Sequence, residues 1–144
     1  MTVVDALVVL SALLVATIVV GLYVRWRQTR PRREVRGEVV EPRRLGATTL
    51  GERATLLQFS TQTCAHCPTV HRTLTTIAGE REGVVHLDVD LTHRPDIAKH
   101  FNVLQTPTTL ILDRHGVAQT RFGGSPRRDV VELELTRVTE QAGT

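Results

Sequence analysis

The stretch Thr63-Cys64-Ala65-His66-Cys67-Pro68 decides the fold expected for this chain, and it contains both cysteines of the sequence. An apolar run at residues 55–59 comes before it, and a helical pattern follows, with one apolar face formed by Val70, Leu74 and Ile77. A strand therefore leads to the cysteine pair, and a helix begins at it. At a helix N-terminus, the backbone dipole and the unpaired amide N–H groups favour a thiolate over a thiol. A C-x-x-C in a strand–helix–strand pattern indicates redox chemistry, although it can also form half of a zinc site.

The N-terminal region contains 19 residues without a charge, from Ala6 to Val24. As a helix with a rise of about 1.5 Å per residue, this run spans roughly 28 Å, close to the roughly 30 Å hydrocarbon thickness of a bilayer. A cleaved signal peptide would carry basic residues before a shorter apolar core, whereas here Asp5 precedes the run and arginines follow it. Tyr23 and Trp26 lie at the boundary, where aromatic side chains favour a membrane interface. Residues 1–27 are therefore predicted to form an uncleaved, single-pass transmembrane anchor.

The positive charge of the chain is concentrated just after this anchor. Residues 25–44 contain eight arginines and three glutamates, net +5, whereas residues 45–144 contain ten basic and eleven acidic side chains, net −1. Because Lys and Arg accumulate on the cytoplasmic side of a span, the domain is expected on the cytoplasmic side of the cell membrane. The basic block is expected to contact anionic lipid headgroups, and nucleic acid is not an expected partner of the nearly neutral domain. Two prolines, high charge density and no periodicity predict a flexible tether at residues 28–44.

The remaining residues, 45–144, predict one α/β domain. Its expected elements are a strand, a helix, a strand, a short helix, a two-stranded hairpin and a last helix, at residues 55–59, 66–78, 84–89, 95–101, 108–112, 117–122 and from 125 onward. Ser125 is expected to cap the last helix, with Pro126 as its first residue. Its buried face is expected to comprise Val131, Leu135, Val138 and Ala142. Because right-handed crossovers join parallel strands, this order predicts a mixed central sheet with helices on both faces.

Three motifs in this domain resemble the thioredoxin superfamily over roughly residues 47–142. They are the C-x-x-C after the first long strand, Thr106-Pro107-Thr108 before the hairpin, and Gly123-Gly124 before the last helix. The resemblance implies a thioredoxin-like fold and thiol–disulfide oxidoreductase activity. It also implies that Cys64 is the attacking thiolate and Cys67 the resolving thiol.

The same resemblance implies a substrate site next to the cysteines. Pro107 would be a cis-proline that faces the pair, and the backbone of Thr106 would pair with an extended substrate segment. His66, before the second cysteine, is similar to the active sites of protein disulfide isomerases and of oxidising periplasmic enzymes. Because a nearby imidazole favours the thiolate and makes the disulfide a stronger oxidant, His66 is a candidate tuning residue. The alternative is that His66 is a solvated residue of the first helical turn.

The sequence departs from thioredoxins proper around the motif. Ser60 and Thr63 stand where those proteins keep aromatic side chains, and the only Trp of the chain is Trp26, in the anchor. Gln58 stands where they keep a buried carboxylate that is thought to take the proton of the resolving thiol. An amide cannot accept that proton as a general base. Gln58 is therefore a second candidate tuning residue, and resolution by Cys67 is expected to be slow or to use water or another residue.

Metal binding and a non-catalytic role are the alternatives to redox chemistry. Four potential zinc ligands lie close in sequence, Cys64, His66, Cys67 and His71, but His66 falls between the cysteines and there is no second half-site. Covalent haem attachment needs His directly after the second cysteine, where Pro68 stands. A membrane-tethered module could instead hold an extended peptide near Pro107 without turnover. The other histidines and two nearby aspartates are expected to be solvated or structural: His71, His86, His93, His100, His115, Asp88 and Asp90.

The sequence thus predicts a membrane-anchored thiol–disulfide oxidoreductase that uses the dithiol/disulfide centre Cys64-Ala65-His66-Cys67 to reduce protein disulfides in the cytoplasm. With the opposite topology, the protein would be an extracytoplasmic disulfide donor or a cytochrome-maturation reductase. Expected partners are protein disulfide or dithiol substrates, the lipid bilayer, and a redox donor such as a thioredoxin-reductase-type protein or a membrane electron carrier. No cofactor and no metal are expected.

Overall fold

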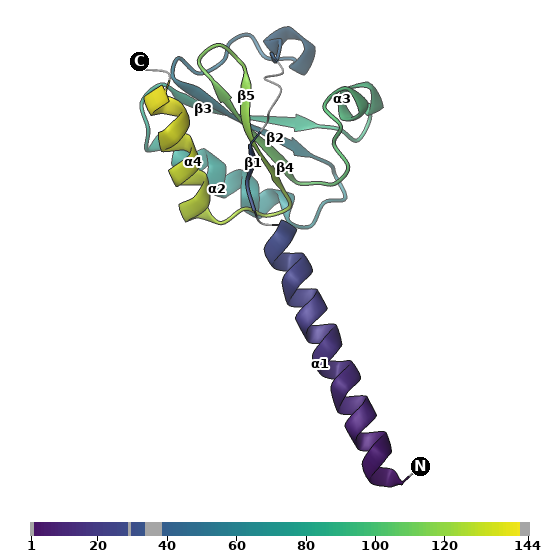
Figure 1. The fold of residues 1–144 in the computed structure, drawn as a ribbon. Helices are drawn as coiled ribbons and strands as arrows, with labels where there is room; N and C mark the ends of the chain where they lie inside the picture. Colours follow the sequence, from purple (N-terminus) through teal and green to yellow (C-terminus); the bar gives the residue numbers. More distant parts are fainter. Residues whose placement is uncertain (1, 29, 34–38, 142–144) are drawn as a thin grey trace.

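The computed structural model describes residues 2–28, 30–33 and 39–141. Along the chain these residues form α1 (Val3–Gln28), β1 (Arg32–Arg33), the 3-10 helix η1 (Pro42–Leu45), β2 (Ala54–Ser60), α2 (Cys67–Gly79), β3 (Val84–Asp90), α3 (Pro95–His100), β4 (Thr108–Asp113), β5 (Ala118–Gly123) and α4 (Arg128–Gln141). Figure 1 shows α1 as a long helix that leads into a domain built around one sheet. Of the positions discussed above, Ala142 and tether residues 29 and 34–38 lie outside the described residues.

The sheet is mixed, as predicted. Its strands lie in the order β1-β5-β4-β2-β3. β2 is parallel to β3 and antiparallel to β4, and β5 is antiparallel to β4. Because α2 connects the two parallel strands, it crosses the sheet on one face. α2 and α4 cover that face and α3 lies on the other (Figure 1), so the predicted mixed sheet with helices on both faces is confirmed.

Each face of the sheet has its own hydrophobic core, because successive strand residues point to opposite sides. Leu56 and Ile111 belong to the cluster under α2 and α4, whereas Leu57 and Leu110 belong to the cluster on the α3 side. All four are at most 1% exposed, and burial of each stabilises the fold by about 2 kcal/mol. Gln58 follows Leu56 by two residues, so its fully buried side chain lies on the α2 side. A polar group is thereby placed beneath the helix that follows the cysteine loop.

The last helix begins later than predicted. α4 starts at Arg128, so Ser125 is not its cap and Pro126 is not its first residue. The reason lies in the preceding turn, where Gly124 adopts a φ of 80° and its amide donates a hydrogen bond of 2.8 Å to the carbonyl of Pro107. The chain is therefore held at the loop before β4 and needs three more residues to enter the helix. The expected buried residues Val131, Leu135 and Val138 are all buried.

The described part of the expected tether contacts the domain. β1 pairs with β5 at the edge of the sheet. Val40 is 2% exposed, and its amide donates a 2.8 Å hydrogen bond to the carbonyl of Gly116. Leu45, the first residue of the expected domain, is also buried, in the same cluster on the α3 side as Val40. The apolar side chains at these two positions are sufficient reason for the chain to pack on the sheet here.

α1 has the length and composition of a membrane span. The stretch Val3–Arg27 has a mean hydropathy of 2.8, and none of it is buried in the protein. Among the described residues it is the one helix that meets this condition, and a signal sequence would meet it too. Its C-terminal end combines aromatic and basic groups, since the guanidinium of Arg30 lies 3.5 Å from the ring centroid of Trp26.

Candidate redox site

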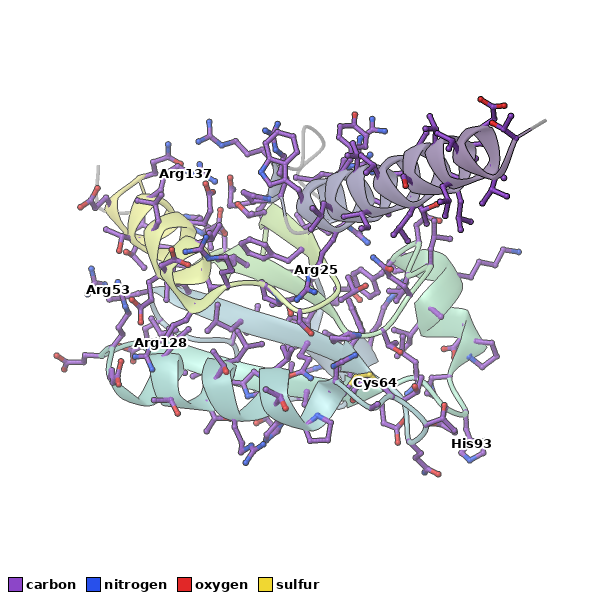
Figure 2. The ribbon with its side chains drawn as sticks, turned by 90° about the horizontal axis from the view of Figure 1, so that it is seen from below. Arg25, Arg53, Cys64, His93, Arg128 and Arg137 are labelled. Carbon is purple, nitrogen blue, oxygen red and sulfur yellow. A yellow bond between two sulfur atoms is a disulfide. The ribbon has the colours of Figure 1, made fainter. Side chains whose placement is uncertain are left out.

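Cys64 and Cys67 form a disulfide at the N-terminus of α2, with their Cα atoms 5.5 Å apart (Figure 2). Cys64 lies in the loop after β2 and is half-buried, whereas Cys67 is the first residue of α2 and is only 5% exposed. The loop is tightened by a hydrogen bond from the Cys64 amide to the carbonyl of Thr61. Pro68 lies in the first turn of α2, where a backbone N–H would have no partner within the helix, so the missing N–H of proline removes no helical hydrogen bond. Cys64 is thus partly accessible, and Cys67 is enclosed.

His66 occupies the N-cap position of α2. Its side chain is exposed and makes no capping hydrogen bond to the helix. An exposed imidazole here lies between the two cysteines and at the positive end of the helix dipole. Its role in tuning the cysteine pair stays a prediction.

The loop before β4 lies against the cysteine loop. The Thr106–Pro107 peptide bond is cis, as the resemblance implied. The hydroxyls of Thr106 and Thr61 are 3.3 Å apart, which joins this loop to the segment that leads to Cys64. The amide of Gly124 holds the other side of Pro107, through the bond described above. The structure therefore brings the two sequence motifs together, while the substrate-binding roles of Thr106 and Pro107 remain predictions.

Gln58 connects the resolving position to a histidine that the sequence left without a role. Its Nε2 donates a hydrogen bond of 3.1 Å to the backbone carbonyl of Cys67. Since a carbonyl only accepts, the Oε1 atom must face the other way, where it lies 3.1 Å from Nε2 of His86. His86 therefore donates through Nε2, and its Nδ1 accepts from the Thr75 hydroxyl at 2.9 Å. We call Gln58, His86 and Thr75 the inner ladder.

A second ladder of polar groups runs beside the first. The Ser60 hydroxyl donates to Oδ1 of Asp88 at 2.6 Å, and His71 Nδ1 donates to Oδ2 of the same carboxylate at 3.0 Å. We call Ser60, Asp88 and His71 the outer ladder. Each ladder runs from β2 through β3 to α2, with members two residues apart on the strands and four apart on the helix. Both ladders therefore tie α2 to the sheet.

The two histidines of the ladders influence each other. Their rings meet edge to face, with centroids 4.8 Å apart. Burial lowers the pKa of His86 to about 4, positive charge on His71 acts in the same direction, and Asp88 opposes both. His86 is therefore neutral at pH 7, which agrees with an Nδ1 that accepts from Thr75.

Sequence reasoning did not connect His86 to Gln58. The strand pattern at residues 84–89 placed His86 correctly on one side of the strand, but the register of two parallel strands joined by a helix is not encoded in either strand alone. In the structure, Gln58 lies directly beside Asp88, and His86 lies beside Leu56. His71 and His86, which were expected to be solvated or structural, both have side-chain partners in the structure.

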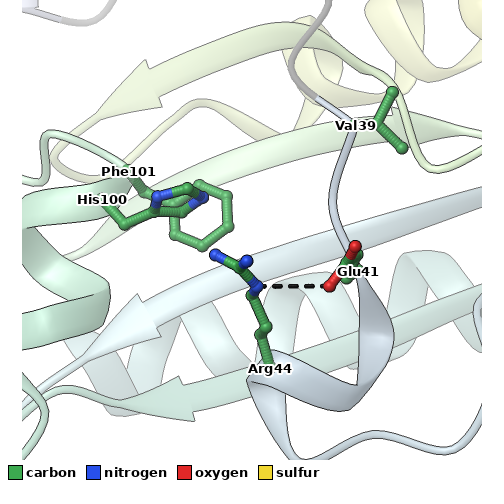
Figure 3. A pocket seen from close by; sticks show the side chains of 5 residues that line it. All are labelled: Val39, Glu41, Arg44, His100 and Phe101. Carbon is green, nitrogen blue, oxygen red and sulfur yellow. Dashed lines mark hydrogen bonds and ion pairs between the residues drawn. The ribbon is translucent and has the colours of Figure 1, made fainter.

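The described residues contain no group of three or more His, Cys, Asp and Glu side chains placed to hold a metal ion. A separate hollow of about 170 Å³ lies on the other side of the sheet, lined by Val39, Glu41, Arg44, His100 and Phe101 (Figure 3). Within it, Nε of Arg44 lies 3.2 Å from a carboxylate oxygen of Glu41. No lining residue belongs to the cysteine loop, α2 or the loop with the cis bond. The hollow is therefore separate from the redox site.

Comparison with known proteins gives these observations a context. The family model described as Thioredoxin matches residues 47–136 of this chain. A search of curated proteins finds no match. Among solved structures, a thioredoxin-like protein from Clostridium perfringens is 27% identical, with a TM-score of 0.55 and coverage of 69% of this chain and 79% of that chain.

Two further structures are similar in fold. Thioredoxin-2 of a malaria parasite, described as a component of its protein secretion machinery, is 15% identical, with a TM-score of 0.57 and coverage of 74% of this chain and 98% of that chain. A mutant thioredoxin from Halobacterium salinarum is 16% identical, with a TM-score of 0.54 and coverage of 61% and 76%. The predicted thioredoxin-like α/β fold is therefore confirmed.

Proposed function

Because the chain belongs to the thioredoxin family, we propose that it is a membrane-anchored thiol–disulfide oxidoreductase that reduces protein disulfides through Cys64 and Cys67. The arrangement of the cysteine pair carries this proposal. Cys64 is half-buried in a surface loop, Cys67 is enclosed at the start of α2, and the two are joined by a disulfide. A pair of this kind can alternate between dithiol and disulfide by exchange with a substrate. The adjacent loop with Thr106 and Pro107 is the proposed place for the extended backbone of that substrate.

The proposed reaction begins with the Cys64 thiolate, which the N-terminus of α2 favours. The thiolate attacks one sulfur of the substrate disulfide, so that a bond forms between Cys64 and the substrate, and the other substrate sulfur leaves as a thiolate. The Cys67 thiolate then attacks the Cys64 sulfur. The Cys64–Cys67 bond forms, the bond to the substrate breaks, and the second substrate sulfur leaves as a thiolate. The substrate gains two electrons and two protons, and the protein ends as its disulfide.

The proton of the Cys67 thiol must leave before the second attack. Gln58 offers an N–H donor toward Cys67, and an amide is not a base. We therefore propose that water takes this proton. A dithiol donor of the thioredoxin-reductase type, or a membrane electron carrier, would restore the reduced form by the reverse exchange.

The anchor places this chemistry at a membrane. The apolar stretch Val3–Arg27 is long enough to span a bilayer, and the arginines that follow it favour a cytoplasmic domain. A cytoplasmic domain works in a reducing compartment, which favours reduction of substrate disulfides.

Two measurements test the proposal. The first compares disulfide reduction by the full-length protein and by its Cys64→Ser variant, in detergent micelles with a dithiol as the electron source. Loss of activity in the variant supports an oxidoreductase, whereas equal activity in both supports a peptide-binding module without turnover. The second treats intact cells with a membrane-impermeant thiol reagent, with and without prior reduction. Labelling only after the cells are permeabilised supports the cytoplasmic side, and labelling of intact cells places the domain outside.

A further inference from the structure

The inner ladder is the connection between the sheet and the backbone of the resolving cysteine. Gln58 is 0% exposed, so its amide has no access to water, and both ends of the amide need protein partners. One end is bonded to the Cys67 carbonyl and the other to His86. An amide that lacked the His86 partner would have a buried oxygen without a donor, which is unfavourable. The bonded orientation is therefore strongly preferred.

His86 is itself held from two sides. Thr75, on the third turn of α2, donates to Nδ1, and this fixes the ring so that Nε2 points at Gln58. The ring also meets His71 of the outer ladder. The charged groups that face it are His71 from α2 and Asp88 from β3. His86 thus has one defined orientation and one defined proton position.

The geometry points to His86 as a positioning residue for the resolving cysteine, acting through the Gln58 amide on the backbone of Cys67. This inference rests on the function proposed above. Resolution needs the Cys67 sulfur in line with the bond between Cys64 and the substrate, because a displaced nucleophile loses much of the advantage of an intramolecular attack. Cys67 is the first residue of α2, where its own amide has no helical partner. The bond from Gln58 fixes its peptide plane from below.

The outer ladder provides a matched comparison. It joins the same strands and the same helix, and like the inner ladder it contains a hydroxyl and a histidine, with the Asp88 carboxylate as its third member. It ends at His71, one turn into α2, and makes no hydrogen bond to Cys67. Removing the Ser60 hydroxyl therefore weakens the attachment of α2 without releasing the Cys67 carbonyl. If the inner ladder had a purely structural role, variants of the inner ladder would give the same result as the change at Ser60.

The test separates the two chemical steps in the full-length, reduced protein in detergent micelles. A nitrobenzoate disulfide releases one coloured thiolate when Cys64 attacks it, at a rate that depends on its concentration. It releases a second when Cys67 resolves the mixed disulfide, at a rate that does not. Both rates are measured by stopped flow for the wild type and for His86→Leu, His86→Gln, Thr75→Val and Ser60→Ala, together with the thermal unfolding of each.

In His86→Leu and Thr75→Val the second rate is expected to fall about tenfold, with less than about a twofold change in the first rate, since only the alignment of Cys67 is disturbed. His86→Gln keeps an N–H donor and is expected to restore most of the second rate. Ser60→Ala is expected to lower stability without changing either rate. Equal second rates in all folded variants, or a loss in Ser60→Ala as large as in Thr75→Val, would overturn the inference.

A double-mutant cycle tests whether His86 acts through Gln58. Gln58→Leu alone is expected to slow the second step as much as His86→Leu does, and the double variant is expected to be no slower than either single variant. If the double variant instead slows the second step by the product of the two single effects, His86 acts by another route, and the inference is overturned. Failure of the proposed function looks different, because the wild type would then show no first release that Cys64→Ser abolishes.

Discussion

Acidification is expected to destabilise the domain through His86, because this imidazole is neutral in the folded protein. Its pKa is lowered from 6.5 to about 4, first by burial and then by His71. In the unfolded chain the same group takes up a proton near pH 6.5. The unfolded state therefore binds more protons as the pH falls, and the stabilising contribution of the neutral ring, complete above pH 6.5, is lost progressively down to about pH 4.

The size of this effect follows from the shift. For a fully buried group, a change of this size at about 1.4 kcal/mol per pH unit would correspond to roughly 3 kcal/mol. His86 is only partly buried, and water screens part of its interaction. We therefore expect a contribution of about 1–2 kcal/mol to the free energy of unfolding between pH 7 and pH 4.5.

The assay is denaturant unfolding of the oxidised, full-length protein in micelles at these two pH values. The His86→Gln variant is the control, since it keeps an N–H donor for Gln58 but has no group that titrates. Carboxylates that titrate in the same range affect both proteins equally, so the difference between the two pH-dependent losses isolates His86. The wild type is expected to lose about 1–2 kcal/mol more than the variant. An equal loss in both proteins would refute a neutral, buried imidazole at this position.

Two further predictions concern the site and the anchor. Gln58→Asp is expected to speed the resolving step at pH 7, because a carboxylate near Cys67 can accept the thiol proton. The control is Gln58→Asn, whose side chain has the size of Asp but no charge, and which is not expected to speed this step. Stopped-flow rates of mixed-disulfide resolution compare the two variants, and equal rates contradict the prediction. Reduction of the protein is expected to change tryptophan fluorescence little, because Trp26 is the only Trp and lies in α1, under Arg30. A large change on reduction would show that Trp26 packs near the cysteines.

Local patterns were enough to predict the elements of the domain. The apolar run before Cys64 predicted β2, and the apolar face after it predicted α2. A continuous apolar run and an apolar residue at every third or fourth position are different patterns, and each is visible within about ten residues. The pairing of the C-x-x-C with Thr106-Pro107 also held in space, through the contact between Thr61 and Thr106. Two motifs far apart in sequence are informative together, because a fold that explains both must bring the two segments close in space.

Features that depend on tertiary packing were not predictable. The contact of Val40 with the sheet is one, since two adjacent valines in a charged segment have no periodicity to reveal it. The late start of α4 is another, because Ser125 and Pro126 have the right chemistry for a helix start, and only the bond from Gly124 to Pro107 delays it. The inner ladder is the third, since it needs the register of β2 and β3.

The ladder also gives a physical reason for the amide at position 58. A carboxylate buried there would serve as a base for Cys67, but a buried charge without a cation beside it is costly, and His86 is neutral at pH 7. Gln58 instead has a partner at each end and leaves no charge beneath α2. The resolving step then has no side-chain base. With water as the proton acceptor, its rate depends on the fraction of Cys67 present as thiolate. Its rate should then rise about tenfold per pH unit below the pKa of that thiol, while attack by the half-buried Cys64 follows a pH profile of its own. In the proposed mechanism the two cysteines, three residues apart, have separate surroundings: the helix N-terminus and the candidate tuning residue His66 for Cys64, and the inner ladder for Cys67.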